Sequence, residues 1–146
     1  MLAVPAETAR ILIADDHPLI RLAVRQELAE ADFEVCAEAG DGPSAVAAAV
    51  RLEPDLCLLD LHMPGGGLET TRKIKRRFPH VKVVVLTACE DENEMLEVIL
   101  AGASGLLGKD TDPARLPHVL HAVLQGELAV PRALVGKLVE RLLGDR

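Results

Sequence analysis

Short apolar runs alternate along the chain with longer stretches in which apolar residues recur every three or four positions. The short runs are nearly continuous in leucine, isoleucine, valine and alanine, which is typical of strands buried on both faces of a parallel sheet. The longer stretches have the spacing of amphipathic helices. The predicted strands cover 10–15, 33–39, 54–61, 81–88 and 104–109, and the predicted helices cover 19–31, 42–53, 67–79, 91–103 and 112–126. These five repeats predict an α/β fold, a five-stranded parallel sheet with helices on both faces.

Local signals mark several helix starts. Asp41 is suited to cap the second predicted helix, and Pro113 to occupy the first position of the fifth. We interpret His17 and Pro18 as residues that begin the first helix rather than as chemistry. His17 and His62 stand beside carboxylates, but their spacing fits no closed zinc site.

Polar side chains stand at the carboxyl ends of four predicted strands. Asp15 and Asp16 end the first strand, Asp60 the third, Thr87 the fourth and Lys109 the fifth. Ligands of open α/β sheets bind at this edge. The sequence therefore predicts that three carboxylates, a hydroxyl and an ammonium converge there.

Three carboxylates in one crevice repel one another unless a cation joins them. Ligand sets made only of oxygen favour a hard ion, and Mg²⁺ commonly takes one or two carboxylates together with waters and phosphate oxygens. Such a site suits phosphoryl chemistry, in which a carboxylate can be the nucleophile and a lysine can hold a phosphate oxygen. The alternative for Asp15 and Asp16 is a pair of acids at a helix N-terminus.

Composition narrows the class of protein. A length of 146 residues fits one domain with an appended element. The net charge of −7 and the aromatic fraction of 1% count against direct binding to nucleic acid, which needs clustered cations or stacking rings. Cys36, Cys57 and Cys89 are an odd number in apolar runs, which indicates reduced core cysteines. Without a signal peptide or membrane span, the expected location is cytoplasmic.

Four motifs in order, "ADDHPLIR", "DLHMPGG", "VVVLTA" and "AGASGLLGKD", resemble the receiver domain of two-component response regulators. They most resemble the LuxR/NarL/FixJ-type subgroup, in which a helix-turn-helix DNA-binding domain follows the receiver. The similarity runs from about Arg10 to Gly126, so we expect a receiver domain over 1–126. The resemblance implies the flavodoxin-like strand order 2-1-3-4-5.

The resemblance also implies a role for each acid. Asp60 matches the aspartate that a sensor histidine kinase phosphorylates. Asp16 matches a direct Mg²⁺ ligand and Asp15 one that acts largely through water. Asp60 and the backbone carbonyl of His62 complete the implied Mg²⁺ site, so the His62 ring need not be a ligand.

Thr87 and Lys109 match the hydroxyl and the ammonium that sense the phosphoryl group in the family. Three features depart from the family pattern. Leu106 stands where an aromatic residue usually rotates inward on activation, which puts an aromatic readout in question. The loop "PGGGLE" is one residue shorter than usual, and Asp110 replaces a frequent proline.

Residues 127–146 exceed a five-fold α/β domain. Pro131 is suited to open a helix, which would carry an apolar stripe. A helix of this length is marginal alone, so we expect it to pack on its own domain or on a second copy. In the resembling subgroup this segment links the receiver to a DNA-binding domain, so we expect this chain, which stops before a helix-turn-helix, to be either a fragment of such a regulator or a stand-alone receiver. The stripe comprises Leu134, Val135, Leu138, Val139, Leu142 and Leu143.

The leading interpretation is a signalling module, not a metabolic enzyme, that catalyses only its own phosphorylation and dephosphorylation. Phosphorylation of Asp60 would switch dimerisation through the fourth helix, fifth strand and fifth helix. The expected partners are a sensor histidine kinase and a second copy, with DNA reached only through the absent domain and no membrane. Two alternatives stay open: a pseudo-receiver that binds partners without phosphorylation, and an aspartyl-phosphate phosphohydrolase. The latter often has a second acid where this chain has His62.

Overall fold

Five parallel strands form one sheet in the order β2-β1-β3-β4-β5 in the computed structural model, which describes residues 8–88 and 90–144. The strand order and the α/β fold class predicted above are confirmed. The strands are β1 (Arg10–Ala14), β2 (Glu34–Ala39), β3 (Leu56–Asp60), β4 (Lys82–Thr87) and β5 (Gly105–Gly108). The helices are α1 (Pro18–Glu30), α2 (Gly42–Leu52), α3 (Gly67–Arg77), α4 (Glu92–Leu100), the 3₁₀ turn η1 (Pro113–Arg115), α5 (Leu116–Leu124) and α6 (Arg132–Gly144).

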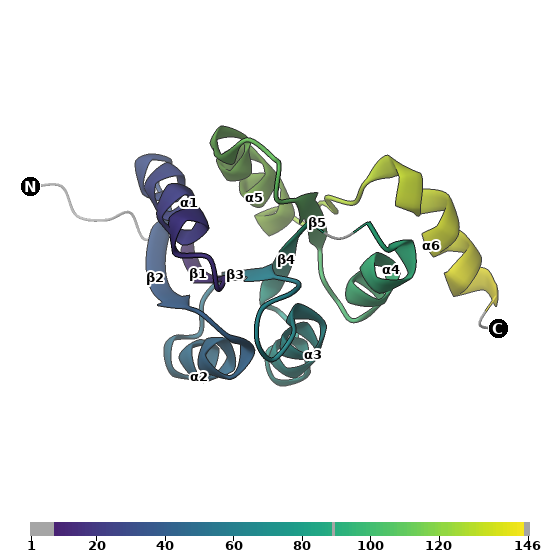
Figure 1. Ribbon diagram of the computed structural model, residues 1–146, viewed down its shortest axis with the longest axis horizontal. Helices are drawn as coiled ribbons and strands as arrows, with labels where there is room; N and C mark the ends of the chain where they lie inside the picture. Colours follow the sequence, from purple (N-terminus) through teal and green to yellow (C-terminus); the bar gives the residue numbers. More distant parts are fainter. Residues whose placement is uncertain (1–7, 89, 145–146) are drawn as a thin grey trace, which may run out of the picture.

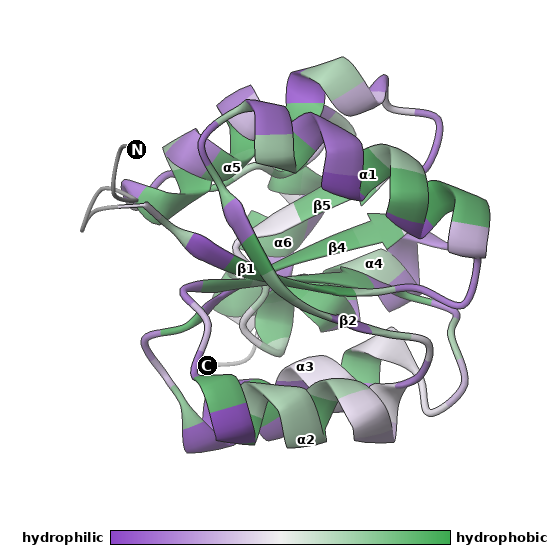
Figure 2. Ribbon diagram, turned by 90° about the vertical axis from the view of Figure 1, so that its left-hand side faces the viewer, coloured by the Kyte–Doolittle hydropathy of each residue, from purple (hydrophilic) through white to green (hydrophobic). Residues whose placement is uncertain are grey.

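Helices cover the sheet on both faces, with α1 and α5 on one side and α2, α3 and α4 on the other (Figure 1). Successive strand residues point to opposite faces of the sheet, so each apolar run contributes side chains to the hydrophobic cores on both faces. Ile11 and Ile13 of β1 pack beneath α1 and α5, whereas Leu12 and Ala14 pack beneath the other helices. Figure 2 shows the apolar strands between the two helical layers. This double coverage explains why the strands read as continuous rather than alternating apolar runs.

Aspartate side chains cap α2, α4 and the 3₁₀ turn η1. Asp41 caps α2 by accepting a hydrogen bond from the backbone N–H of Ser44 at 2.7 Å, as predicted. The helix expected over 112–126 is interrupted, because Pro113 opens the 3₁₀ turn and α5 begins only after it. Pro117 has no N–H to donate to the carbonyl four residues back, so an α-helical turn cannot close there.

The C-terminal segment packs on its own domain. Ala129 accepts a hydrogen bond from the backbone N–H of Leu106 at 2.8 Å and donates one to Ser104 at 2.9 Å, so the linker extends the free edge of β5. Leu134 of α6 is only 1% exposed and joins the core cluster that contains Leu106. Figure 1 shows α6 lying along the outer side of α4, and the Lys137 ammonium pairs with Glu92 of α4.

The described cysteines lie in or near the core. Cys57 in β3 is buried and Cys36 in β2 is half-buried, while Cys89 lies outside the described residues. Burial raises the pKa of the Cys57 thiol to about 12. Across the described ranges, the structure contains no helix with the length and apolarity that a membrane crossing requires.

Candidate functional site

The polar residues predicted to converge lie at the carboxyl edge of the sheet. Asp60 is the last residue of β3, and Asp15 directly follows β1. Lys109 follows β5, and its ammonium Nζ lies 2.9 Å from Asp60 Oδ2 and 3.4 Å from Asp15 Oδ2. Its backbone N–H donates to the carbonyl of Thr87 at 2.9 Å, which ties the ends of β4 and β5 together. The sheet thus brings residues that lie far apart in the sequence to one place.

The side chains of the site differ in how deeply they are buried. The side chains of Asp15 and Asp60 are 3% and 2% exposed, and that of Lys109 is 13% exposed. Asp16 is more open, and its Oδ1 lies 3.0 Å from the ring of His17. Three carboxylates against one ammonium leave an excess of negative charge, which favours a further cation.

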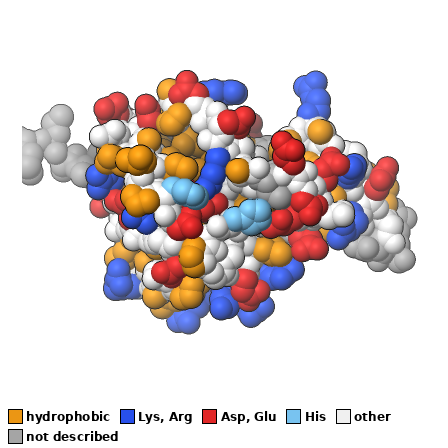
Figure 3. All heavy atoms as spheres, in the orientation of Figure 1, with side chains coloured by type: hydrophobic (Ala, Val, Ile, Leu, Met, Phe, Trp, Pro, Cys, Tyr) orange, Lys and Arg blue, Asp and Glu red, His pale blue; other side chains and the backbone are white. Residues whose placement is uncertain are grey.

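The two buried carboxylates have unused acceptor capacity. Among the described residues, Oδ2 of Asp15 and Oδ2 of Asp60 are buried and accept no hydrogen bond, and Lys109 reaches them only as an ion pair. One ligand atom each from Asp15, Asp16, His17 and Asp60 lies within 4.8 Å of the others. Carboxylate oxygens at such spacing fit a hard divalent cation. Figure 3 shows acidic side chains gathered with histidines on this face of the molecule.

His17 is the residue that sequence reasoning missed. Its ring Nδ1 lies 2.8 Å from Asp15 Oδ1, 3.8 Å from Asp60 Oδ2 and 3.0 Å from Lys109 Nζ. The residue does begin α1, as predicted, but its ring belongs to the acidic site. The signal available in the sequence was its position directly after two acids at a strand end.

His62 lines the mouth of the site together with Asp60. Its backbone N–H donates to Asp60 Oδ1 at 3.2 Å, and its ring Nε2 lies 2.6 Å from Glu94 Oε1 of α4. A hollow of about 180 Å³ opens beside it, with walls that include Ile20, Asp60 and Lys109. The carboxylate that ends β3 is therefore reached from solvent through this hollow.

The glycine loop after β3 folds back closely on the strand end. Gly65 and Gly66 have φ of 89° and 76°, in the left-handed region that favours glycine. A Cβ on Gly67 would lie 2.6 Å from the carbonyl oxygen of Asp60 and 2.6 Å from Cα of Leu61. Glycine is therefore required for the loop to pass this close to the Asp60 backbone.

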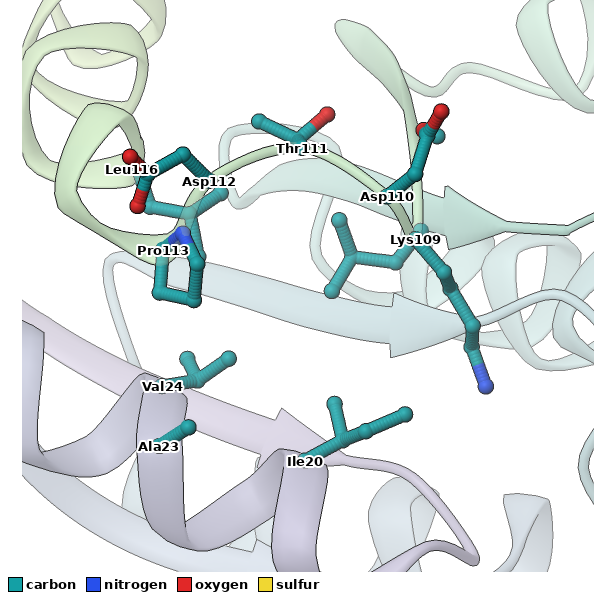
Figure 4. Close-up of a pocket in the computed structure, with 11 residues that line it drawn as sticks. Ile20, Ala23, Val24, Lys109, Asp110, Thr111, Asp112, Pro113 and Leu116 are labelled. Atoms are coloured by element: carbon teal, nitrogen blue, oxygen red, sulfur yellow. The ribbon is translucent and has the colours of Figure 1, made fainter.

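A larger apolar cavity of about 350 Å³ also borders Lys109. Figure 4 shows Ile20, Ala23 and Val24 of α1 facing the loop that runs from Lys109 to Pro113. Apolar walls favour the aliphatic stem of lysine and leave its ammonium to seek polar partners. This cavity helps to explain why the Lys109 ammonium lies among the acids.

Leu106, at the position of the family's switch aromatic, is 1% exposed and packs in the same core cluster as Leu134. It lies next to the linker, since its backbone bonds to Ala129. The peptide bond between Lys109 and Asp110 is trans.

The fold and the site together define a doubly wound α/β domain with an acidic, cation-attracting crevice at the carboxyl ends of its strands. The family model described as response regulator receiver domain matches residues 11–121. This chain therefore belongs to the response regulator receiver domain family, as its motifs predicted. Receiver domains are signalling modules of two-component systems and bind Mg²⁺ at an acidic pocket, and membership implies a histidine kinase partner.

The similar proteins place the chain near the NarL/LuxR-type regulators. It is 38% identical to the nitrate/nitrite response regulator protein NarL of Escherichia coli K12 over 142 residues, which are 96% of this chain and 66% of NarL. It is 38% identical to the transcriptional regulatory protein LiaR of Bacillus subtilis over 135 residues, 91% of this chain and 64% of LiaR. The chain thus spans about two thirds of the length of these relatives.

Solved structures agree with this placement. A LuxR-family two-component response regulator from Aurantimonas superposes with a TM-score of 0.82 at 32% identity, covering 94% of this chain and 99% of that one. The isolated receiver domain of RcsB from Salmonella enterica, solved with the phosphomimetic BeF₃⁻, gives a TM-score of 0.79 at 27% identity, covering 90% of this chain and 99% of that one.

Proposed function

We propose that this chain is a phosphorylation-controlled switch in which Asp60 accepts a phosphoryl group from a sensor histidine kinase. The observation that carries the proposal is the buried Asp60 carboxylate with the Lys109 ammonium 2.9 Å away, at a hollow open to solvent. Asp15, Asp16, Asp60 and the backbone carbonyl of His62 would hold Mg²⁺. The fit rests on the buried oxygens of Asp15 and Asp60 that accept no hydrogen bond among the described residues.

The chemistry is a transfer from nitrogen to oxygen. An Asp60 carboxylate oxygen forms a bond to phosphorus while the bond from phosphorus to the kinase imidazole breaks, and the imidazole leaves with the bonding electron pair. Mg²⁺, when bound, offsets charge on the phosphoryl oxygens. The Lys109 ammonium pairs with one phosphoryl oxygen, and the Thr87 hydroxyl donates to another.

Phosphorylation of Asp60 would act by changing the surface of the domain. Thr87 lies just before α4, and Lys109 just after β5, so a phosphoryl group between them biases the positions of both elements. We propose that the surface of α4, β5 and α5 then favours dimerisation. Transcriptional control would run through a DNA-binding domain, which is not among the described residues, and the switch would act in the cytoplasm.

The second candidate is a pseudo-receiver that binds partners without phosphorylation. The burial of Leu106 in place of a mobile aromatic favours it, as does the short glycine loop. A phosphohydrolase is a weaker candidate, because the position of its second acid is occupied by His62, whose ring pairs with Glu94.

The test is phosphorylation by acetyl phosphate in Mg²⁺, followed by intact-mass spectrometry. We expect the chain to gain one phosphoryl group, and Asp60→Asn to gain none. Asp55→Asn is the matched control, because Asp55 lies at the opposite end of β3 and accepts a hydrogen bond from the Arg10 backbone. Absence of modification and of BeF₃⁻ binding would support the pseudo-receiver. Turnover of many phosphate esters would support the hydrolase.

A further inference from the structure

One nitrogen of His17 is shared by more partners than it can satisfy. Its Nδ1 lies 2.8 Å from Asp15 Oδ1 and 3.0 Å from Asp16 Oδ1, both hydrogen-bond acceptors. The same atom lies 3.0 Å from the Lys109 ammonium, which only donates. One ring nitrogen thus lies within hydrogen-bond distance of two carboxylate oxygens and of an ammonium at once.

A divalent cation offers one common partner to the carboxylates and to the ring nitrogen. A cation among these groups attracts both carboxylates and the lone pair of an unprotonated Nδ1. One ligand atom each from Asp15, Asp16, His17 and Asp60 already lies within 4.8 Å of the others. The buried Oδ2 atoms of Asp15 and Asp60 accept no hydrogen bond among the described residues and pair with the Lys109 ammonium, so these oxygens keep room for a second positive partner.

The His17 ring can adjust while its backbone holds it at the site. Its side chain is 56% exposed and makes no hydrogen bond that caps α1. Its backbone is fixed, because its N–H donates to Asp15 Oδ1 at 2.8 Å and its carbonyl accepts from Arg21 at 3.1 Å. The His62 side chain is similarly exposed, at 57%, but its ring pairs with Glu94 of α4 and not with the aspartates of the site.

We propose that His17 is a nitrogen donor to the cation of this site and therefore sets its metal preference. Imidazole suits the later transition metals, to which N/O sites bind more tightly along the series from Mn²⁺ through Co²⁺ to Cu²⁺, whereas Mg²⁺ prefers oxygen and gives up its waters reluctantly. The ring therefore raises the affinity for Co²⁺ far more than that for Mg²⁺. The inference rests on the proposed function, since it concerns the cation that assists phosphorylation of Asp60.

The test compares cation affinities by calorimetry in the unmodified chain, in His17→Ala and in His80→Ala. His80 is an exposed histidine between α3 and β4 and serves as the matched control. We expect His17→Ala to weaken Co²⁺ binding by about tenfold or more, since loss of even an outer partner of a metal ligand costs roughly 10–100-fold. Mg²⁺ affinity should change by less than about threefold, and His80→Ala should change neither.

A spectroscopic readout identifies the donor directly. In the Co²⁺-loaded chain, a ligating imidazole shows a strongly shifted ring N–H proton signal that disappears in D₂O. We expect this signal in the unmodified chain and in His80→Ala, and its loss in His17→Ala. Circular dichroism establishes that each variant is folded before the spectra are compared.

The outcomes separate this inference from the proposed function. An unchanged ratio of Co²⁺ to Mg²⁺ affinity in His17→Ala, or a shifted signal lost with His62→Ala instead, overturns the role of His17. Phosphorylation of Asp60 with Mg²⁺ would then still stand. Failure of the unmodified chain to bind either cation overturns both the inference and the proposed metal site.

Discussion

Leu134 provides the main apolar anchor of α6, so Leu134→Ala should release this helix. The side chain is 1% exposed, whereas Val135, Val139, Leu142 and Leu143 are 47–58% exposed. Leu138 is half-buried, and Lys137 pairs with Glu92, whose side chains are 51% and 41% exposed. Exposed pairs contribute about 0–1 kcal/mol. Leu134 is therefore the most deeply buried side chain that holds α6 on the domain.

The magnitude follows from the atoms removed. Leucine to alanine deletes three carbons, and about 0.8 kcal/mol for each buried CH₂ gives roughly 2–3 kcal/mol. A cavity would add to this loss if the helix stayed in place. Because 1.4 kcal/mol is about a tenfold change in an equilibrium constant, the ratio of docked to released helix should fall by roughly 100-fold. Alanine is a good helix former, so the loss is one of packing rather than of helix propensity.

The assay is native-state hydrogen exchange followed by residue. In Leu134→Ala, amides of α6 and the bond from Leu106 to Ala129 should exchange faster, while β1, β3 and β4 keep their protection. Val135→Ala is the matched control, because it is the next residue and 48% exposed. Equal protection of α6 in both variants would show that Leu134 does not anchor it. Equal loss of protection in the sheet would show that α6 unfolds only with the whole domain.

Two further perturbations test the buried groups of the sheet. Lys109→Met leaves the buried carboxylates of Asp15 and Asp60 without their ammonium partner, so the free energy of unfolding measured with denaturant should fall by about 3 kcal/mol. Adding Asp60→Asn removes one of these charges and should restore part of the lost stability. An unchanged free energy of unfolding in Lys109→Met would refute the pairing. Because the pKa of Cys57 is raised from 9.0 to about 12, the unfolded chain alone loses this proton above about pH 9. Above about pH 9 the free energy of unfolding should therefore fall with rising pH, by up to about 1.4 kcal/mol per pH unit. Denaturation at several pH values should show that Cys57→Val lacks this part of the pH dependence. Identical slopes of stability against pH in both chains would contradict the role of the Cys57 thiol.

The strands could be predicted because their burial leaves a direct mark on the sequence. β1, β3 and β4 are covered on both faces, so their interior residues are apolar, and polar residues stand only at or beyond the strand ends. This placement of polar residues indicated Asp60 and Lys109 as site residues before their distance was known. Their closeness depends on the strand order, which periodicity does not encode and the family resemblance implied.

The interruption before α5 shows where a helical pattern was insufficient. Apolar residues keep a helical spacing across 112–126, so the pattern predicted one helix. Pro113 and Pro117 are four positions apart, and the missing N–H of the second removes the hydrogen bond to the carbonyl of the first. The sequence held this signal, but Pro113 was interpreted only as a good first residue.

His17 was misread because helix entry and site chemistry were treated as exclusive. Pro18 at the start of α1 has no N–H, so one of the donors left unpaired at a helix start is missing from the outset. The backbone of His17 alone begins the helix, since its carbonyl accepts from Arg21 at 3.1 Å. The ring makes no hydrogen bond that caps α1, and the backbone bond to Asp15 holds it beside the carboxylates. His17 therefore begins α1 with its backbone and lies in the acidic site with its side chain, two positions that the sequence interpretation had kept apart.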